Sequence, residues 1–164
     1  MLKPLDLDGI LSRVGRHSQA LAAQKEVTVL VEPLAHLEVS GDEGELDRVF
    51  SNLMDNALKF TPAKGRVTLS LRTEVGEGVE AGLRFAAARV QDTGLGIPAE
   101  DLPYVFDPYH QAPAGRTQGG FGLGLAIVAR IVAEHGGRIR AQSQLGVGTE
   151  FSVLLPLEAA PPPG

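Results

Sequence analysis

The chain of 164 residues contains no cysteine and no tryptophan, and only 5% of its residues are aromatic. Without cysteine it has neither disulfides nor thiolate chemistry, which is usual for a cytosolic protein. It also lacks a signal peptide and any apolar run near the roughly 18 residues that a membrane-spanning helix needs. The net charge is −5, which argues against nucleic-acid binding, because that requires a basic surface. We therefore expect a cytoplasmic domain that contacts neither nucleic acid nor membrane directly, although a longer parent protein could be membrane-anchored.

The size and composition of the chain predict a single domain followed by a tail. With 43% hydrophobic residues it is able to bury a sizeable core. Its first residues read like the interior of a protein, and its last residues, rich in alanine and proline, read like a linker. We expect a domain over residues 1–156 and a Pro-rich tail or linker over 157–164, both taken from a longer protein.

Hydrophobic periodicity predicts the order of helices and strands. It predicts helices over 8–24, from 40–42 to 61–62, over 99–105 and over 122–134, and strands over 27–31, 37–39, 67–72, 83–90, 138–143 and 149–155. Strands joined as hairpins and helices gathered on one face predict an α/β fold: a two-layer sandwich of a mixed, mostly antiparallel sheet with helices packed on one face. Residues 108–120 have no periodicity and contain two prolines and three glycines, so we expect a mobile loop there.

The first candidate motif is Asp92–Pro98, in which a carboxylate follows an apolar run and directly precedes two closely spaced glycines. A carboxylate accepts hydrogen bonds from an exocyclic amine. Glycines let the backbone approach a flat ring or turn with positive φ. This combination suits adenine recognition, although the same pattern also forms plain turns between strands.

A second motif lies on the long helix predicted to end at 61–62. Asn52 and Asn56 are four residues apart and share one face, and Lys59 stays near that face. Amide oxygens suit Mg²⁺ held jointly with phosphates, and a lysine neutralises phosphate charge. The solvated side of an amphipathic helix is the simpler reading of these residues in isolation. Asparagine is a poor helix former, however, which favours a function.

A third motif is the glycine-rich run 119–124, just before a predicted helix. Exposed N–H groups at a helix start bind phosphate. No Gly-Lys-Ser/Thr follows, so the run is not a P-loop, and its glycine spacing is not that of a dinucleotide-binding site. A flexible hinge before the helix is an equally good reading.

The four histidines suggest no site. His17 and His36 have no acidic company in the sequence, His110 lies in the predicted loop, and His135 ends a helix, where a cation suits the dipole. We expect all four to be surface residues and none to belong to a metal site.

Together the three motifs resemble the ATP-binding catalytic domain of bacterial sensor histidine kinases. This Bergerat-type fold is shared with gyrase, the large heat-shock chaperone and the mismatch-repair ATPases. The resemblance extends from Leu5 to Pro156. Residues 52–60 look like the family's N box, 92–98 like G1, 106–109 like the F box and 120–125 like G2, and 148–149 fit its last motif.

The resemblance implies a role for individual residues. Asn56 would ligate Mg²⁺, Asn52 would support the metal and the phosphates, and Lys59 would contact phosphate. Asp92 would accept the adenine amine. The other implied ATP-binding residues are Phe60 beside the adenine, Gly94, Gly96 and Ile97 in the base pocket, Phe106 and Tyr109 anchoring the lid, Gly120, Gly122, Leu123, Gly124 and Leu125 near the phosphates, and Thr149.

Two positions depart from the family pattern. Phe121 stands where Thr or Ser is common within G2, which puts the usual lid closure in doubt. Gln111 stands where many members have Arg after the F box. Arg116 is then the candidate for the cationic contact to the γ-phosphate, and we count it with Asn56 and Lys59 as catalytic.

The residue four positions before Asn56 separates two activities. The ATPases of this fold carry Glu there to activate water, whereas this chain has Asn52, and an amide cannot act as a general base. The resemblance therefore implies a protein-histidine kinase that transfers the γ-phosphoryl of Mg-ATP to a histidine on a separate dimerisation domain, with a response regulator downstream. No histidine here lies in a phosphoacceptor-like sequence, so we expect little or no autophosphorylation. An ATPase of the same fold, or a degenerate nucleotide-binding docking module, is the alternative.

Overall fold

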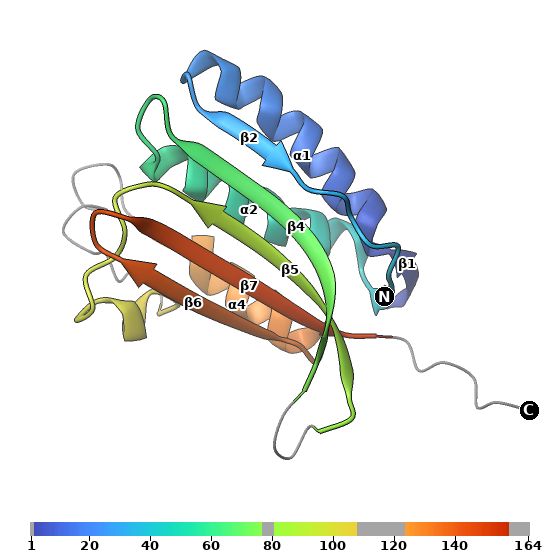
Figure 1. The fold of residues 1–164 in the computed structure, drawn as a ribbon. Coiled ribbons are helices and arrows are strands. Elements are labelled where there is room, and N and C mark those ends of the chain that lie inside the picture. The colour runs from blue at the N-terminus through green and yellow to red at the C-terminus, as the bar shows by residue number, and fades with distance from the viewer. Residues whose placement is uncertain (1, 77–80, 108–123, 158–164) are drawn as a thin grey trace, which may run out of the picture.

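The computed structural model describes residues 2–76, 81–107 and 124–157 (Figure 1). The helices are α1 Leu7–Gln24, α2 Glu43–Phe60, the short 3₁₀ helix η2 Leu102–Tyr104 and α4 Gly124–Glu134; the strands are β1 Lys3–Asp6, β2 Thr28–Val31, β3 Glu38–Gly41, β4 Arg66–Val75, β5 Arg84–Asp92, β6 Arg138–Gln144 and β7 Gly148–Pro156. No helix among these residues is both long enough and apolar enough to span a membrane.

Five strands form one sheet in the order β2-β4-β5-β7-β6, and β1 and β3 form a separate two-stranded sheet. Only the β2–β4 pair of the larger sheet is parallel, and the other neighbours are antiparallel. Helices α1, α2 and α4 cover the same face of this sheet (Figure 1). The two-layer, mixed and mostly antiparallel α/β fold predicted from the sequence is confirmed.

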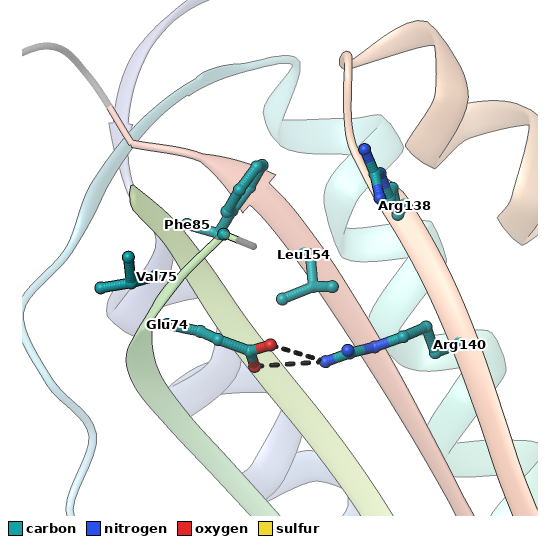
Figure 2. Close-up of a pocket in the computed structure, with 7 residues that line it drawn as sticks. Glu74, Val75, Phe85, Arg138, Arg140 and Leu154 are labelled. Atoms are coloured by element: carbon teal, nitrogen blue, oxygen red, sulfur yellow. Dashed lines mark hydrogen bonds and ion pairs between the residues drawn. The ribbon is translucent and has the colours of Figure 1, made fainter. Parts of the chain in front are cut away.

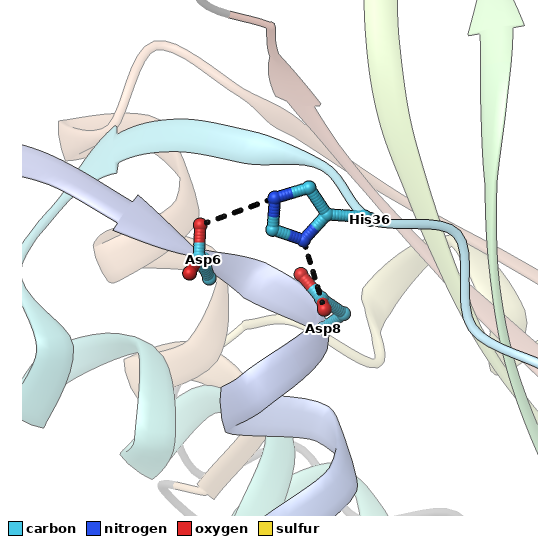
Figure 3. A group of neighbouring side chains, drawn as sticks. All are labelled: Asp6, Asp8 and His36. Carbon is cyan, nitrogen blue, oxygen red and sulfur yellow. Dashed lines mark hydrogen bonds and ion pairs between the residues drawn. The ribbon is translucent and has the colours of Figure 1, made fainter.

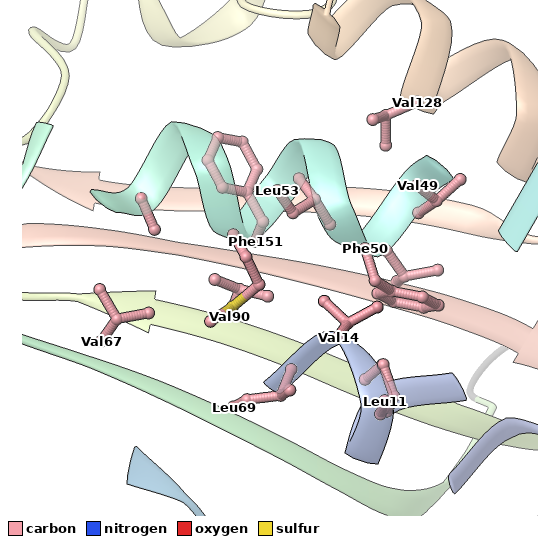
Figure 4. Packing of buried hydrophobic residues seen from close by; sticks show 14 of the residues in the cluster. Leu11, Val14, Val49, Phe50, Leu53, Val67, Leu69, Val90, Val128 and Phe151 are labelled. Atoms are coloured by element: carbon pink, nitrogen blue, oxygen red, sulfur yellow. The ribbon is translucent and has the colours of Figure 1, made fainter. Parts of the chain in front are cut away.

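The core fills the space between the helices and the sheet. On β5 the residues at alternate positions, Ala88 and Val90, turn toward the helices, as does Phe151 on β7, and all three are buried. From α2, Phe50 and Leu53 meet them (Figure 4). Burial of such an apolar side chain contributes about 1.5–3 kcal/mol. This packing holds α2 rigidly on the sheet.

Helix α2 begins and ends where its sequence predicts. The Asp42 side chain caps its first turn by accepting a hydrogen bond from the Glu45 N–H at 3.0 Å. At the other end Thr61 leaves the helix in an extended conformation, and its hydroxyl donates to the Ala57 carbonyl at 2.7 Å. The helix therefore stops at Phe60, next to the strand end that carries Asp92.

Two elements differ from the sequence-based expectation. The helix expected over 99–105 is only the three-residue turn η2. Pro103 explains this, because it has no N–H to donate to a carbonyl one turn earlier. Strand β1 was not expected, since Pro4 and exposed residues leave it no hydrophobic alternation. It exists because its backbone pairs with β3, Leu5 opposite Val39.

Candidate nucleotide-binding site

Asp92 is the last residue of β5 and is buried, with 7% of its surface exposed. The Gly94 N–H donates to its Oδ1 at 2.8 Å and the Thr149 N–H donates to the same oxygen at 3.3 Å. Within the described residues no hydrogen bond is made to Oδ2. One carboxylate oxygen is thus fixed by the backbone, and the other is available to a further donor.

Burial sets the protonation behaviour of this group. Desolvation raises the pKa of the Asp92 carboxyl above its ordinary value, and the hydrogen bonds from Gly94 and Thr149 oppose the rise without cancelling it. The ionised carboxylate is therefore under-solvated where it stands. A hydrogen-bond donor placed on Oδ2 would replace part of the lost hydration.

The backbone after Asp92 is held against the end of α2. The Leu95 N–H donates to the Phe60 carbonyl at 3.2 Å. At Gly94 a side chain is excluded, because a Cβ would run into the Phe60 carbonyl oxygen and lie 2.9 Å from Asp92 Oδ1. The Asp92–Pro98 and Asn52–Phe60 motifs, far apart in the sequence, therefore meet at one point.

The rest of the Asp92–Pro98 segment is fixed by β6 and the turn after it. Gly96 has a φ of +77°, which favours glycine. The N–H of the buried Ile97 donates to Ser143 Oγ at 2.7 Å. The Ser143 hydroxyl in turn donates to the Gly148 carbonyl at 2.9 Å and lies 2.8 Å from Thr149 Oγ1.

The sequence-based prediction missed Ser143. Its position on β6, two residues after the inward-facing Ala141, follows from strand alternation. Its role does not, because a serine facing inward at the end of a strand has no motif of its own. Ser143 supports the predicted residues Ile97 and Thr149 from behind.

The three predicted residues on α2 lie on its half-covered side. Asn52 and Asn56 are partly buried, and neither side chain hydrogen-bonds to another residue in the described part of the chain. Lys59 is exposed, and its Nζ lies 5.6 Å from the centre of the Phe60 ring. Half-enclosed amide oxygens without protein donors are suitable ligands for a hard cation.

The remaining predicted residues fall into two groups. Phe106 packs edge-to-face on Phe151, with ring centres 6.0 Å apart, and so ties the start of the predicted lid to the core. Gly124 and the buried Leu125 open α4, which packs against α2. Tyr109, Arg116, Gly120, Gly122 and Leu123, together with Gln111, Phe121 and the predicted loop 108–120, lie outside the described residues.

Comparison with known proteins decides the family. Residues 41–159 match the family described as histidine kinase-, DNA gyrase B-, and HSP90-like ATPase. The chain belongs to this family. It is 34% identical over 155 residues to the sensor histidine kinase RcsC of Escherichia coli (strain K12), an alignment that covers 92% of this chain and 15% of RcsC.

Solved structures agree with this assignment. The mycobacterial sensor histidine kinase MprB superimposes with a TM-score of 0.81 at 28% identity, covering 96% of this chain and 100% of that one. Full-length ShkA, crystallised in complex with AMPPNP, superimposes with a TM-score of 0.77 at 30% identity, covering 97% of this chain and 32% of ShkA. The chain is a histidine kinase catalytic domain, and it spans a minor part of RcsC and ShkA.

Among the cavities formed by described residues, two border the sheet of this kinase domain. One, of about 360 Å³, is lined by Asp92, Ser143 and Thr149 and by the outward-facing side chains of Gln91, Gln142 and Gln144. Because Asn52 and Asn56 belong to the helix layer on the opposite face, this cavity is not the place to which the motifs point.

The other cavity, of about 240 Å³, lies between Phe85, Leu154 and Arg140 at the distant end of the sheet (Figure 2). There Glu74 Oε1 pairs with Arg140 Nη2 at 2.9 Å, and Glu74 Oε2 pairs with Arg89 Nη2 at 2.6 Å. Partly exposed ion pairs of this kind contribute little stability. These ion pairs lie on the outer face of the sheet, which also carries a small apolar cluster of Phe85, Ala87 and Leu154.

The expectation that His36 has no acidic company is wrong. Its Nδ1 lies 3.2 Å from Asp8 Oδ2 and its Nε2 lies 3.8 Å from Asp6 Oδ1 (Figure 3). The hydrogen bond that the ring donates to Asp8, followed by the charges of Asp8 and Asp6, raises the pKa of His36. The sequence could not show this proximity, because it depends on the unexpected pairing of β1 with β3.

The expectation of a surface cation at His135 is also wrong. Its Nε2 accepts the Asp42 N–H at 3.1 Å, and its Nδ1 lies 2.8 Å from the Ile131 carbonyl oxygen. Since Nε2 accepts the Asp42 N–H, the ring donates to the Ile131 carbonyl from Nδ1. His135 therefore joins the end of α4 to the start of α2.

Proposed function

We propose that this domain binds Mg²⁺–ATP and transfers the γ-phosphoryl group to a histidine on a separate dimerisation domain, from which a response regulator receives it. The observation that carries the proposal is the buried Asp92, which keeps one oxygen open beside the end of α2. ShkA, with which this chain shares 30% identity, was crystallised with AMPPNP, an ATP analogue, and this supports a nucleotide at the equivalent place.

Adenine recognition would rest on Asp92. Its Oδ2 would accept the exocyclic amine, while the N–H groups of Gly94 and Thr149 keep the carboxylate in place. Gly94 has no side chain to obstruct the base, and the buried Ile97 offers an apolar contact. Phe60 would flank the ring, and Gly96 would shape the turn beneath it.

The phosphates would lie along α2 toward α4. Asn56 would ligate Mg²⁺ through its amide oxygen, with Asn52 supporting it, because Mg²⁺ selects hard oxygen ligands. When bound, the ion neutralises charge on the β- and γ-phosphates. Lys59 and the N–H groups at Gly124–Leu125 would hold the phosphate oxygens.

The lid residues complete the proposal. Phe106 and Tyr109 would anchor the lid, and Gly120, Gly122 and Leu123 would cradle phosphate through their N–H groups. Arg116 would contact the γ-phosphate. We propose that these residues close over the nucleotide and exclude water, so that the phosphoryl group reaches a histidine instead of being hydrolysed.

Phosphoryl transfer is the favoured reaction because the domain offers no base for water at Asn52. A lone pair on the acceptor imidazole would attack the γ-phosphorus as the bond to the β,γ-bridging oxygen breaks and ADP leaves. The proton on the attacked ring would pass to a base on the dimerisation domain. This chain's contribution is to position the nucleotide and to neutralise charge.

We further propose that the domain occupies residues 1–156 and that 157–164 form a Pro-rich tail or linker. Leu157 still pairs with Val39 at the start of this segment. Because ATP is the phosphoryl donor, we place the domain in the cytoplasm.

Calorimetric titration with AMPPNP, with and without Mg²⁺, tests the nucleotide site. Asp92→Asn keeps an oxygen for Gly94 and Thr149 but removes the charged acceptor, so it is expected to weaken binding by about tenfold to a hundredfold. Asp55→Asn is the matched control, since Asp55 is an exposed carboxylate on α2. Equal binding by wild type and Asp92→Asn would contradict the adenine site.

Transfer is tested separately, by incubating the domain and labelled ATP with the dimerisation domain of its parent kinase. Label on the partner's histidine, lost in Asn56→Ala, supports the kinase reaction. Release of inorganic phosphate without labelled partner would instead favour an ATPase.

A further inference from the structure

Asp6, Asp8 and His36 form a cluster at the junction of β1 and α1, away from the nucleotide-binding residues (Figure 3). Asp6 ends β1, Asp8 lies in the first turn of α1, and His36 lies in the connection between β2 and β3. One nitrogen or oxygen atom from each side chain lies within 4.8 Å of the other two. Figure 3 shows the three side chains pointing toward one another.

The two carboxylates are not engaged by the helix whose start they occupy. Asp6 stands at the N-cap of α1 but makes no side-chain capping hydrogen bond. Asp8 Oδ1 is enclosed and accepts no hydrogen bond in the described part of the chain. An enclosed carboxylate oxygen without a donor is unfavourable, and a cation bound to the Asp8 carboxylate would offset part of that cost.

We propose that Asp6, Asp8 and His36 bind a divalent transition-metal ion, for which Zn²⁺ is the best match. One imidazole nitrogen and two carboxylate oxygens are ligands that Zn²⁺ accepts, with water in the fourth position. Mg²⁺ is a poorer match, because it prefers oxygen ligands in an octahedron. The ion would therefore differ from the one proposed at Asn56.

The spacing of the ligand atoms supports this assignment. Metal–ligand bonds of about 2.0–2.2 Å put neighbouring ligands of a tetrahedral ion roughly 3.3–3.6 Å apart. His36 Nδ1 and Asp8 Oδ2 already stand 3.2 Å apart. Asp6 Oδ1 faces the other ring nitrogen, Nε2, at 3.8 Å, so the Asp6 side chain or the ring must change rotamer before all three ligands meet at Nδ1. The Asp6 side chain is 56% exposed and that of His36 73%, which leaves room for this change.

A bound ion would join the β1–α1 junction to the segment before β3. Without it, the imidazole of His36 lies between the two carboxylates, whose hydrogen bond and charges raise its pKa. Protons and zinc compete for the ring, because only the neutral imidazole ligates a metal ion. Zinc uptake therefore releases protons, which distinguishes it from adsorption to surface carboxylates.

Calorimetric titration of the whole, untagged chain with ZnCl₂, without nucleotide, tests the site. Wild type and His17→Ala are expected to bind one Zn²⁺ saturably, with proton release detected in buffers of different ionisation enthalpy. His36→Ala and Asp6→Asn are expected to weaken binding at least about tenfold. His17 is the matched control, as an exposed histidine on α1.

Equal zinc binding by wild type and His36→Ala would overturn the proposal and indicate an adventitious ion only. No zinc binding by a folded wild type would also overturn it. AMPPNP affinity is expected to be the same in His36→Ala and wild type, so failure of this site and failure of the nucleotide site give different results.

Discussion

The two ends of α2 differ in how far their polar groups are used within the protein. At the N-terminal end, Asp42 accepts the Glu45 N–H and its own N–H donates to His135. At the C-terminal end, Asp92 keeps an oxygen, and Asn56 keeps its amide, without a hydrogen bond to any other described residue. The first arrangement is structural, and the second is suited to a ligand.

The two carboxylates at these ends show what decides the difference. Both accept backbone N–H groups. The bond from Glu45 is the largest cause that lowers the pKa of the half-buried Asp42, whereas burial raises the pKa of Asp92 despite its bonds from Gly94 and Thr149. Backbone hydrogen bonds therefore accompany opposite shifts, and at Asp92 desolvation outweighs them.

The largest expected effect is that of a methyl group at Gly94. Gly94→Ala would push its Cβ into the Phe60 carbonyl oxygen and toward Asp92 Oδ1. The segment after β5 must then shift away from α2. We expect AMPPNP affinity to fall at least about tenfold and stability to fall by about 1–3 kcal/mol, measured by calorimetry and chemical denaturation.

Gly44→Ala is the matched control at the opposite end of α2. A Cβ there meets only Asp42 Oδ1, at an ordinary 3.6 Å, and alanine is the better helix former by up to about 1 kcal/mol. We expect unchanged binding and equal or higher stability. If both alanine variants bound AMPPNP as wild type does, the close approach at Gly94 would not matter for the ligand.

A smaller effect is expected from His135→Ala. It removes the acceptor of the Asp42 N–H and the link to α4, at a cost of about 1–2 kcal/mol in the free energy of unfolding. Nucleotide affinity should not change, since His135 lies at the structural end of α2. His17→Ala, an exposed change on α1, should stay within about 0.5 kcal/mol of wild type. Loss of AMPPNP binding in His135→Ala would contradict the assignment of a purely structural role to the N-terminal end of α2.

The sequence was sufficient for the strands and the mixed, mostly antiparallel character of the larger sheet, for α2, and for singling out the Asp92–Pro98 and Asn52–Phe60 motifs. Each depends on local signals: alternation in strands, the capping Asp42, and glycines next to a carboxylate. The sequence could also place Asp92 at a strand end. It could not show that Gly94 packs on the Phe60 carbonyl, because that contact depends on how α2 lies on the sheet.

The expectations that failed depend on long-range contacts. Strand β1 has no hydrophobic pattern and forms only by pairing with β3, so the partners of His36 were hidden as well. His135 reads as a helix-end cation until the helix start at Asp42, far away in the sequence, is brought beside it. Ser143 also depends on long-range contacts, because its hydroxyl bonds to the backbone of Ile97 and Gly148, which only the folded sheet brings beside it.

The smallest expected effect is a pH dependence caused by Asp92. Stability and nucleotide affinity are expected to change in opposite directions as the pH rises. Because burial raises the pKa of this carboxyl in the folded state, its ionised form is disfavoured by folding. Its contribution to stability is most favourable below the unfolded pKa and declines as pH rises through the folded pKa. Wild type measured against Asp92→Asn should therefore lose relative stability as the pH rises above about 4.

Binding should follow the opposite trend. The adenine amine donates to the ionised carboxylate, so AMPPNP affinity of the wild type should weaken toward about pH 4, with little such change in Asp92→Asn. Denaturation and calorimetry over the same pH series measure both trends. A stability difference that is flat with pH would mean that Oδ2 is already solvated or paired. A binding curve that is the same in both proteins would mean that the amine does not bind there. If stability falls and AMPPNP affinity rises as the pH increases, the negative charge on Asp92 both destabilises the fold and binds the adenine amine.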